Sequence, residues 1–237
     1  MNNIQDLVAK TTKELILTEP FYGLFLIGIN KKFTDQIPTA GVSKHGIGMQ
    51  LTINPEFYIN LSNPHRIGLI KHELLHIAFG HLLMRDLYTN HKLFNIAADL
   101  EINQYILESN LPDGGLLLSS FPELNLPRKA GTKVYYNLLE QAEKDGSAPS
   151  LDNLMDKMDG ESEYCHETWN EFDDLSEPDK KLMSKQVDHQ LKQSAETTIK
   201  KSGSIPGEFK DIIDRLFHIE PAKFDWKGYL KRFVGNS

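Results

Sequence analysis

The sequence predicts an α+β fold in which a small, mostly antiparallel sheet packs on a pair of helices, with a helical part at the C-terminus. Aromatic and β-branched segments at 21–33 and 46–54 indicate two strands, and the turn-rich letters PTAGVSKHG lie between them. Apolar residues recur at helical spacing before and after this region. The length of 237 residues suffices for one sizeable domain.

Changes in composition divide the chain into three regions. Residues 1–139 are expected to form the core. Residues 140–175 are expected to form a mobile acidic insertion, because the stretch 140–179 holds 14 acidic residues against two lysines. Residues 176–237 again show helical patterns and are expected to pack on the core.

Charge and cysteine content exclude several classes of protein. The 26 basic and 33 acidic residues give a formal net charge of −7, which argues against a nucleic-acid partner. The single cysteine, Cys165, rules out an intrachain disulfide and suits a reducing cytosol. The apolar run at 24–29 is too short to span a bilayer. We therefore expect a cytoplasmic protein with no membrane or nucleic-acid partner.

Two helices in the middle of the core have well-marked ends. The first is expected over 64–79, with Asn63 as its N-cap, Pro64 at its first position and Gly80 as the left-handed residue that ends it. The second is expected over about 91–109 and ends at the letters LPDGG. The short connection between them allows antiparallel packing.

The first of these helices carries the letters HELLH, which place His72, Glu73 and His76 within five positions. Side chains four apart project from one helical face, so both imidazoles can reach one zinc ion at roughly 2.0–2.1 Å. Glu73 lies about 100° further round the helix, where it can hold and deprotonate a water without binding the metal. Gly68, one turn before His72, leaves room for another segment to approach closely. The pattern predicts a zinc-dependent hydrolase.

A catalytic zinc ion also needs a third protein ligand and an open position for water. His81 can serve only if Gly80 ends the helix and turns the chain back. Asp99 belongs to a polar stripe with Asn95 and Asn103 on an otherwise apolar helix, and packing of the helix pair would bring it beside the histidines. We favour Asp99 over His81; the alternative for Asp99 is a carboxylate that orients a ligand histidine. The two asparagines are expected to hold the helices in register or to bond to groups behind the ligands.

Four segments together resemble a known family: TINPEFYINL, HELLHIAFGH, FNIAADLEINQYI and FDWKGYLKRFV. They are similar to the metallopeptidase domain that precedes von Willebrand A-like domains in bacteria and phages, and the likeness covers most of the chain. It implies a zincin-like fold, in which a small sheet lies over the helix that carries the zinc motif. It also implies that His72, Glu73, His76 and Asp99 match the family's zinc site. Because the von Willebrand A-like domain would begin where this sequence ends, we expect a stand-alone version or a truncated one.

The letters YCHETWN resemble a stretch in which relatives place a histidine shortly before a tryptophan. By this resemblance His166 would be catalytic, donating a hydrogen bond to a developing oxyanion. A surface histidine in an acidic loop is the alternative, and the letters favour it at least as much. Trp169 is expected to anchor the loop by packing it down. Cys165 lies beside His166, but neighbours on a flexible loop are not positioned for proton transfer, which argues against cysteine catalysis.

The leading hypothesis is a zinc-dependent metallopeptidase that holds one zinc ion through His72, His76 and Asp99. In this hypothesis Glu73 is the general base, the substrate is a peptide or protein, and the strand at 46–54 offers a free edge for it. The alternative is a non-catalytic, zinc-stabilised module that works with a protein partner or with the von Willebrand A-like domain. Three protein ligands with an open position would favour the enzyme, and four would favour the module. A metal-free helical scaffold is a third hypothesis.

Overall fold

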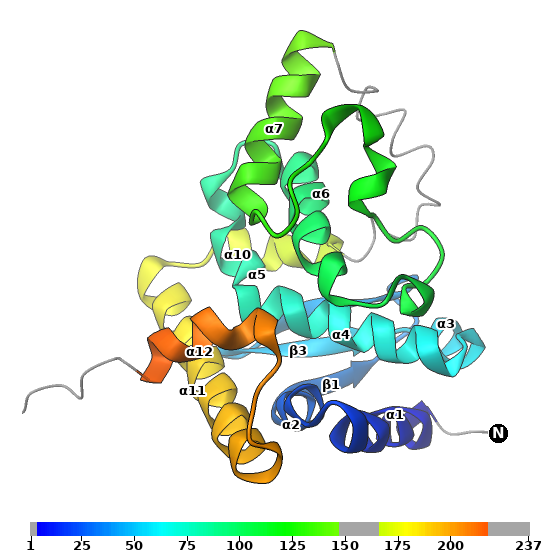
Figure 1. The fold of residues 1–237 in the computed structure, drawn as a ribbon. Helices are drawn as coiled ribbons and strands as arrows, with labels where there is room; N and C mark the ends of the chain where they lie inside the picture. The colour runs from blue at the N-terminus through cyan, green and yellow to red at the C-terminus, as the bar shows by residue number, and fades with distance from the viewer. Residues whose placement is uncertain (1–3, 147–165, 218–237) are drawn as a thin grey trace, which may run out of the picture.

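The computed structural model describes residues 4–146 and 166–217 and shows a mostly helical α+β fold with one small sheet (Figure 1). The expected α+β class is confirmed. Within the described residues, no helix combines the length and the apolar character needed to cross a membrane. The strands and α-helices are α1 (Ile4–Thr18), α2 (Pro20–Gly28), β1 (Asn30–Phe33), β2 (Ala40–His45), β3 (Gly48–Ile53), α3 (Pro55–Asn60), α4 (Asn63–Phe79), α5 (His81–Met84), α6 (His91–Ile102), α7 (Thr132–Asp145), α10 (Asn170–Asp173), α11 (Glu177–Ser202) and α12 (Lys210–Phe217).

The sheet is mixed, with the strand order β1-β3-β2. β1 pairs in parallel with β3, with Asn30 opposite Gln50, whereas β2 pairs antiparallel with β3, with Ala40 opposite Ile53. The expectation of a mostly antiparallel sheet is therefore wrong, because one of the two strand pairs is parallel. A tight turn reverses the chain between β2 and β3, and β3 then lies beside β1 in the same direction.

The strand β2 was not foreseen, because its glycine and serine resemble a turn. Residues 40–43 are nevertheless buried, as expected for a strand that covers the core. Since β3 lies between two partners, the expectation that it offers a free edge is also wrong. The two edge strands are β1 and β2. At β2, Val42 O accepts a hydrogen bond from Thr168 Oγ1 over 2.6 Å, and Lys44 N donates to Glu171 Oε2 over 3.0 Å.

The segment expected as a first strand, 21–33, contains a helix instead. Pro20 opens α2, and only the last residues of the segment form the strand β1. The helix α2 is apolar and largely buried. Its sequence therefore lacks the polar–apolar periodicity that would distinguish a buried helix from a buried strand. Gly23 brings α2 against α1, since a Cβ there would lie 2.5 Å from Ile16 N.

The helix α4 packs against elements from several parts of the fold. It packs against β2, α6, α1 and α2, and in Figure 1 it crosses in front of the sheet with α6 and α7 above it. Ten of its 17 residues are buried, and a helix buried on most sides must find partners for each polar side chain. The polar residues of α4 therefore decide what the surrounding elements supply.

Both ends of α4 follow from local chemistry. The expected end is confirmed, because Gly80 adopts a left-handed conformation with φ of 76°. The N-cap is Ser62 rather than Asn63, since the Ser62 hydroxyl accepts a hydrogen bond from His65 N. The second helix of the pair, α6, is shorter than expected and tightens into a 3-10 turn at Asn103–Tyr105.

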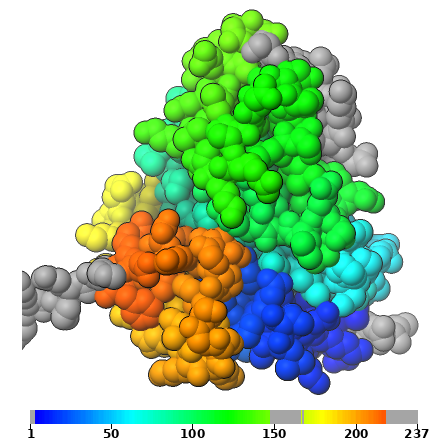
Figure 2. Space-filling view, viewed as in Figure 1, coloured from blue at the N-terminus to red at the C-terminus, as the bar shows by residue number. Residues whose placement is uncertain are grey.

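The C-terminal helices lie against the N-terminal ones, although they are far apart in sequence (Figure 2). Gln190 on α11 donates to Gly28 O over 2.8 Å, and the Tyr22 hydroxyl donates to Glu208 over 2.5 Å. The predicted limits of the acidic insertion and of the C-terminal region stay predictions, because 147–165 and 218–237 lie outside the described residues. Cys165 and the letters FDWKGYLKRFV fall in those ranges.

Gly68 confirms the expected close approach and supplies a stability test. A Cβ at this position would lie 1.8 Å from Asn110 O, so the backbone of a distant loop occupies the space of the missing side chain. We expect Gly68→Ala to lower the free energy of unfolding by about 1–3 kcal/mol through overpacking, although alanine favours a helix by about 1 kcal/mol. Urea denaturation measures the change.

The matched control is Gly28→Ala at the end of α2. A Cβ there would meet only the Gln190 side chain, at 3.7 Å, which is an ordinary contact. This variant should be as stable as the wild type or more stable. Equal stability of the two variants would contradict the close packing at Gly68.

Candidate metal centre

Four side chains from separate parts of the chain meet at one point. α4 carries His72 and His76, α6 carries Asp99, and His166 directly precedes the 3-10 helix η6 (Glu167–Trp169). One donor atom of each lies within 4.8 Å of the donor atoms of the other three. His76, Asp99 and His166 are almost fully buried, whereas the His72 side chain is 12% exposed.

The donor atoms are spaced as tetrahedral ligands would be. His72 Nε2 and His76 Nε2 lie 3.0 Å apart, and Asp99 Oδ1 lies 3.1 Å from the second and 3.6 Å from the first. His166 Nε2 is 3.2 Å from Asp99 Oδ1 and 3.4 Å from His76 Nε2. Tetrahedral zinc with bonds of about 2.0–2.1 Å separates its ligand atoms by about 3.3–3.4 Å. These are five of the six separations among the four donor atoms, and their range of 3.0–3.6 Å includes that value.

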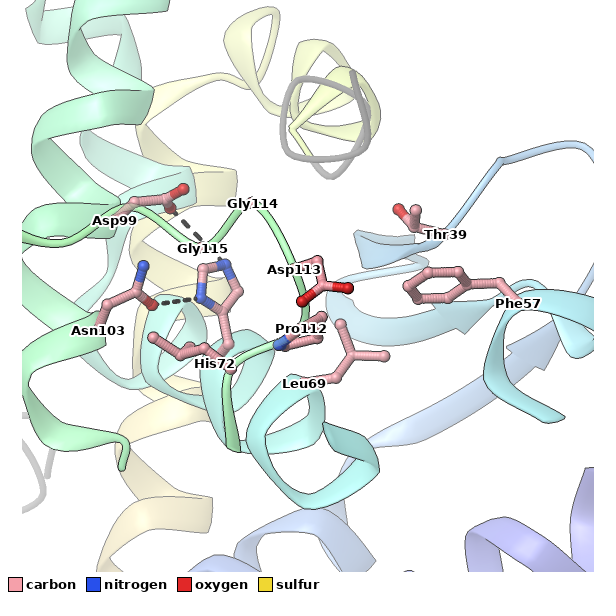
Figure 3. A pocket seen from close by; sticks show the side chains of 11 residues that line it. Thr39, Phe57, Leu69, His72, Asp99, Asn103, Pro112, Asp113, Gly114 and Gly115 are labelled. Atoms are coloured by element: carbon pink, nitrogen blue, oxygen red, sulfur yellow. Dashed lines mark hydrogen bonds and ion pairs between the residues drawn. The ribbon is translucent and has the colours of Figure 1, made fainter. Parts of the chain in front are cut away.

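Asn103 fixes the tautomer of His72. Its amide Nδ2 donates to Leu116 O over 2.8 Å, so Oδ1 is the atom that faces His72 Nδ1, 2.8 Å away (Figure 3). Because a carbonyl oxygen only accepts, His72 Nδ1 must carry the hydrogen and donate it. In the neutral ring, Nε2 is then left with a lone pair that points into the cluster.

A longer chain of hydrogen bonds fixes the tautomer of His76. His81 Nε2 lies 3.3 Å from Glu101 Oε2, and Thr132 donates to the same carboxylate through its N–H and its hydroxyl. Burial would raise the pKa of Glu101, but the hydrogen bonds of His81 and Thr132 hold it below its usual value. His81 Nε2 therefore carries a hydrogen, which faces this carboxylate and the Thr132 hydroxyl oxygen 2.9 Å away. His81 Nδ1 then accepts from His76 Nδ1 over 2.9 Å, which leaves a lone pair on His76 Nε2.

These bonds aim electron pairs at one another. Two imidazole lone pairs and one carboxylate oxygen converge within 3.6 Å in a buried space, and three acceptors at such distances repel unless a cation or a proton lies among them. Imidazole nitrogen and carboxylate oxygen are the donors that zinc and related divalent metals bind. The residues present therefore fit a divalent cation, and the second nitrogen of each α4 histidine is held as in known metal sites.

The electrostatics keep these groups ready to bind a metal. Burial lowers the pKa of His72, and it lowers that of His76 well below its ordinary value with a further contribution from His72, so both rings stay neutral. Burial would raise the pKa of the Asp99 carboxyl. The charge of His166 and its hydrogen bond to the carboxylate instead hold that pKa well below its usual range, so the carboxylate stays ionised.

Glu73 stands out among the buried groups. It is 1% exposed, and neither of its carboxylate oxygens has a hydrogen-bond partner within the described parts of the chain. Burial raises the pKa of this carboxyl well above its ordinary value, and the charge of Asp99 raises it further. A carboxyl group so placed is costly for stability, which is typical of a group with a functional role.

The segment 166–173 is anchored on the core, which places His166 in the cluster. Trp169 is completely buried, and its ring packs against the rings of His76 and His166 at centroid distances of 4.7 and 4.3 Å. Arg85 donates to Asp173 over 2.6 Å and to Asn170 over 2.9 Å. The expectation that Trp169 anchors this part of the chain is confirmed.

Residues 5–237 match the family described as a putative metallopeptidase domain. The chain belongs to this family. The match spans nearly the whole sequence and confirms the resemblance that the helix-pair motifs indicated. No curated protein and no solved structure matches the chain. For this metallopeptidase-domain protein, the cluster of His72, His76, Asp99 and His166 could hold a metal ion.

The sequence brought the right residues into consideration but misplaced some of their contacts. Asp99, the favoured third ligand, lies among the donor atoms, whereas His81 lies behind His76. For His166 the sequence left open a surface position or a place facing an oxyanion; the surface alternative is wrong, because His166 is 3% exposed and its Nε2 lies among the donors. Glu101 was not among the predicted site residues, yet its carboxylate faces His81. The one signal for Glu101 in the sequence is that it is a carboxylate two positions after Asp99.

The bond from Asn103 to His72 gives a test of the geometry behind the ligands. We expect Asn103→Ala to weaken metal binding by about 10–100-fold, because the His72 ring loses the partner that orients its lone pair. Competition with a chelator on the purified protein measures the affinity.

The matched control is Asn95→Ala on the same polar stripe of α6. Asn95 Oδ1 is buried without a hydrogen-bond partner among the described residues, so its removal should leave metal affinity close to that of the wild type. Equal losses in the two variants would show that Asn103 does not act through His72.

Proposed function

We propose that the chain is a zinc-dependent peptidase that hydrolyses peptide bonds in a peptide or protein substrate. The observation that carries the proposal is the buried carboxyl of Glu73, which has no hydrogen-bond partner among the described residues, directly follows His72 in the sequence and is close enough for the charge of Asp99 to raise its pKa. Membership of a metallopeptidase-domain family supports the same reaction. We also propose a zincin-like arrangement, because a small sheet lies against the helix with the two histidines and a second helix supplies the acid.

Zinc is the metal we propose, because two imidazoles and a carboxylate at tetrahedral spacing are typical of its sites. When bound, zinc polarises a carbonyl oxygen and lowers the pKa of a water molecule towards about 7. His72, His76 and Asp99 would hold it on the rigid pair α4 and α6. Asn103 and His81 would keep the two rings aimed at it.

Glu73 is the proposed general base. Burial raises the pKa of this carboxyl, which is the direction that lets a carboxylate return a proton as well as take one. One carboxylate oxygen would take the proton of the attacking water, and the same group would deliver a proton to the leaving nitrogen. No hydrogen bond among the described residues holds the carboxylate in another role.

A second candidate function is favoured by the fourth donor. His166 Nε2 completes a tetrahedral set, and sites closed by four protein ligands are typically structural. In that case the domain would be a metal-stabilised binding or assembly module. The peptidase proposal requires instead that His166 give up its place, or that the metal accept a fifth ligand.

The substitution Glu73→Gln tests the catalytic proposal. The amide keeps the shape of the side chain but cannot accept the proton, so hydrolysis of peptides should fall by about 10²–10⁴-fold. One metal ion per chain should remain bound, because Glu73 is not among the donors. Peptide cleavage is followed by mass spectrometry, and metal content by elemental analysis.

The control variant is Asp99→Asn, which changes a carboxylate of similar burial within the donor set. It should lose metal and hydrolysis together, whereas Glu73→Gln should lose hydrolysis alone. Turnover by Glu73→Gln at the wild-type rate would remove Glu73 from the mechanism.

The substitution His166→Ala separates the two candidate functions. Under the peptidase proposal the variant keeps one metal ion per chain, and the absorption spectrum of Co²⁺-substituted protein changes because a solvent position opens. Under the module alternative the variant loses the metal and its thermal stability. His65→Ala, at a half-buried position near the start of α4 and outside the donor set, is the control and should change neither property.

A further inference from the structure

A small pocket opens beside the candidate metal centre (Figure 3). His72 and Asp99 form part of its wall, and Leu69, Leu111 and Phe57 form the apolar remainder. In Figure 3 the chain at 112–115 arches along one side of the pocket, and Phe57 faces it from the other. The pocket is thus built from α4, α6, α3 and the loop after α6.

The pocket is the side from which the donor cluster can be approached. The His72 side chain, which lines it, is 12% exposed, whereas His76, Asp99 and His166 side chains are 1–3% exposed. The segment 166–173 covers part of the cluster, and the buried Trp169 ring packs against the rings of His76 and His166. Among the described residues, His72 is the most exposed of the donor side chains, so this pocket offers a path from solvent to the centre.

The size of the pocket limits what fits. Its cavity volume is about 50 Å³, and a cavity of about 150 Å³ accepts the six carbons of benzene. By proportion the pocket holds about two to three carbon atoms. A methyl or isopropyl group fits, whereas a phenyl ring does not.

The charges around the pocket limit the ligand further. Asp99 is part of its wall, and Asp113 lies at its edge with its carboxylate turned toward Phe57 (Figure 3). No lysine or arginine is among the described residues that line it. An acidic group would face two carboxylates in an apolar space, which is unfavourable, and a lysine chain is too long for the volume.

We propose that this pocket binds one small, uncharged aliphatic side chain of the substrate, that of alanine or valine, at a residue flanking the cleaved bond. The inference rests on the proposed peptidase function for the identity of the ligand. Leu111 is part of the pocket lining, and His72 and Asp99, which also line the pocket, belong to the metal centre. Leu69 and Phe57 supply the apolar contacts.

Binding of three small probes to the purified chain tests the proposal without requiring hydrolysis. Isobutyramide carries an isopropyl group, benzamide a phenyl ring, and isobutyrate the isopropyl group with a negative charge. The probes are titrated against zinc-free protein, because a carboxylate would bind the metal itself, and the methyl NMR signals of Leu69 and Leu111 report occupation. Isobutyramide should shift these signals saturably and bind about tenfold or more tightly than the other two probes.

The variant Leu111→Ala removes three carbons from the wall and should let benzamide bind at least as tightly as isobutyramide. Its control is Leu126→Ala, a leucine with the same 8% exposure that does not line the pocket, which should keep the wild-type order. Leu111→Val is the milder variant if the first does not fold, and it should narrow the difference between the amides. The proposal is overturned if no probe shifts the methyl signals, if benzamide or isobutyrate binds the wild type as well as isobutyramide, or if neither Leu111 variant alters the order.

A peptide series keeps this proposal distinct from the proposed function. Peptides with alanine or valine next to the cleaved bond should be hydrolysed faster than those with phenylalanine or aspartate, and Leu111→Ala should relax the discrimination against phenylalanine. Selective amide binding without any hydrolysis would count against the peptidase and leave the pocket standing. Hydrolysis with no preference at this residue would contradict the assignment of the pocket and would still support the peptidase function.

Discussion

The meeting of three electron-pair donors between α4 and α6 is the constraint on which the rest of the structure depends. Hydrogen bonds behind the rings force the lone pairs of His72 and His76 toward each other and toward Asp99. An apolar core would not otherwise retain such an arrangement, because like partial charges repel most strongly where water is excluded. A divalent cation turns the same geometry from a cost into a source of stability.

Contacts in several other parts of the molecule hold the three donor side chains in position. Gly68 lets the loop at 108–110 pack against α4, and the chain after that loop supplies Leu116 O, which orients Asn103. The start of α7 supplies Thr132 to the carboxylate behind His81. The segment 166–173 closes the remaining side and occupies outward backbone groups of β2. The most exposed of the donor side chains is that of His72, which lines the pocket.

The parts that could be predicted from the sequence were those governed by local periodicity and end signals. Four-residue spacing placed the two histidines on one face, Gly80 ended the helix, and the stripe through Asp99 indicated the partner helix. Features decided by contacts distant in sequence could not be predicted. An apolar run such as 21–28 suits a buried helix or strand equally, and only its packing on α1 decides. The approach of His166 depends on where Trp169 is buried, which no local pattern records.

The most direct test of the account is anomalous diffraction at the zinc absorption edge, from crystals of the chain grown with zinc. The account predicts one strong peak per chain, bonded to Nε2 of both α4 histidines and to the carboxylate of Asp99. A map with no peak at that position, with the two rings turned apart or bonded only to protein groups, would contradict it.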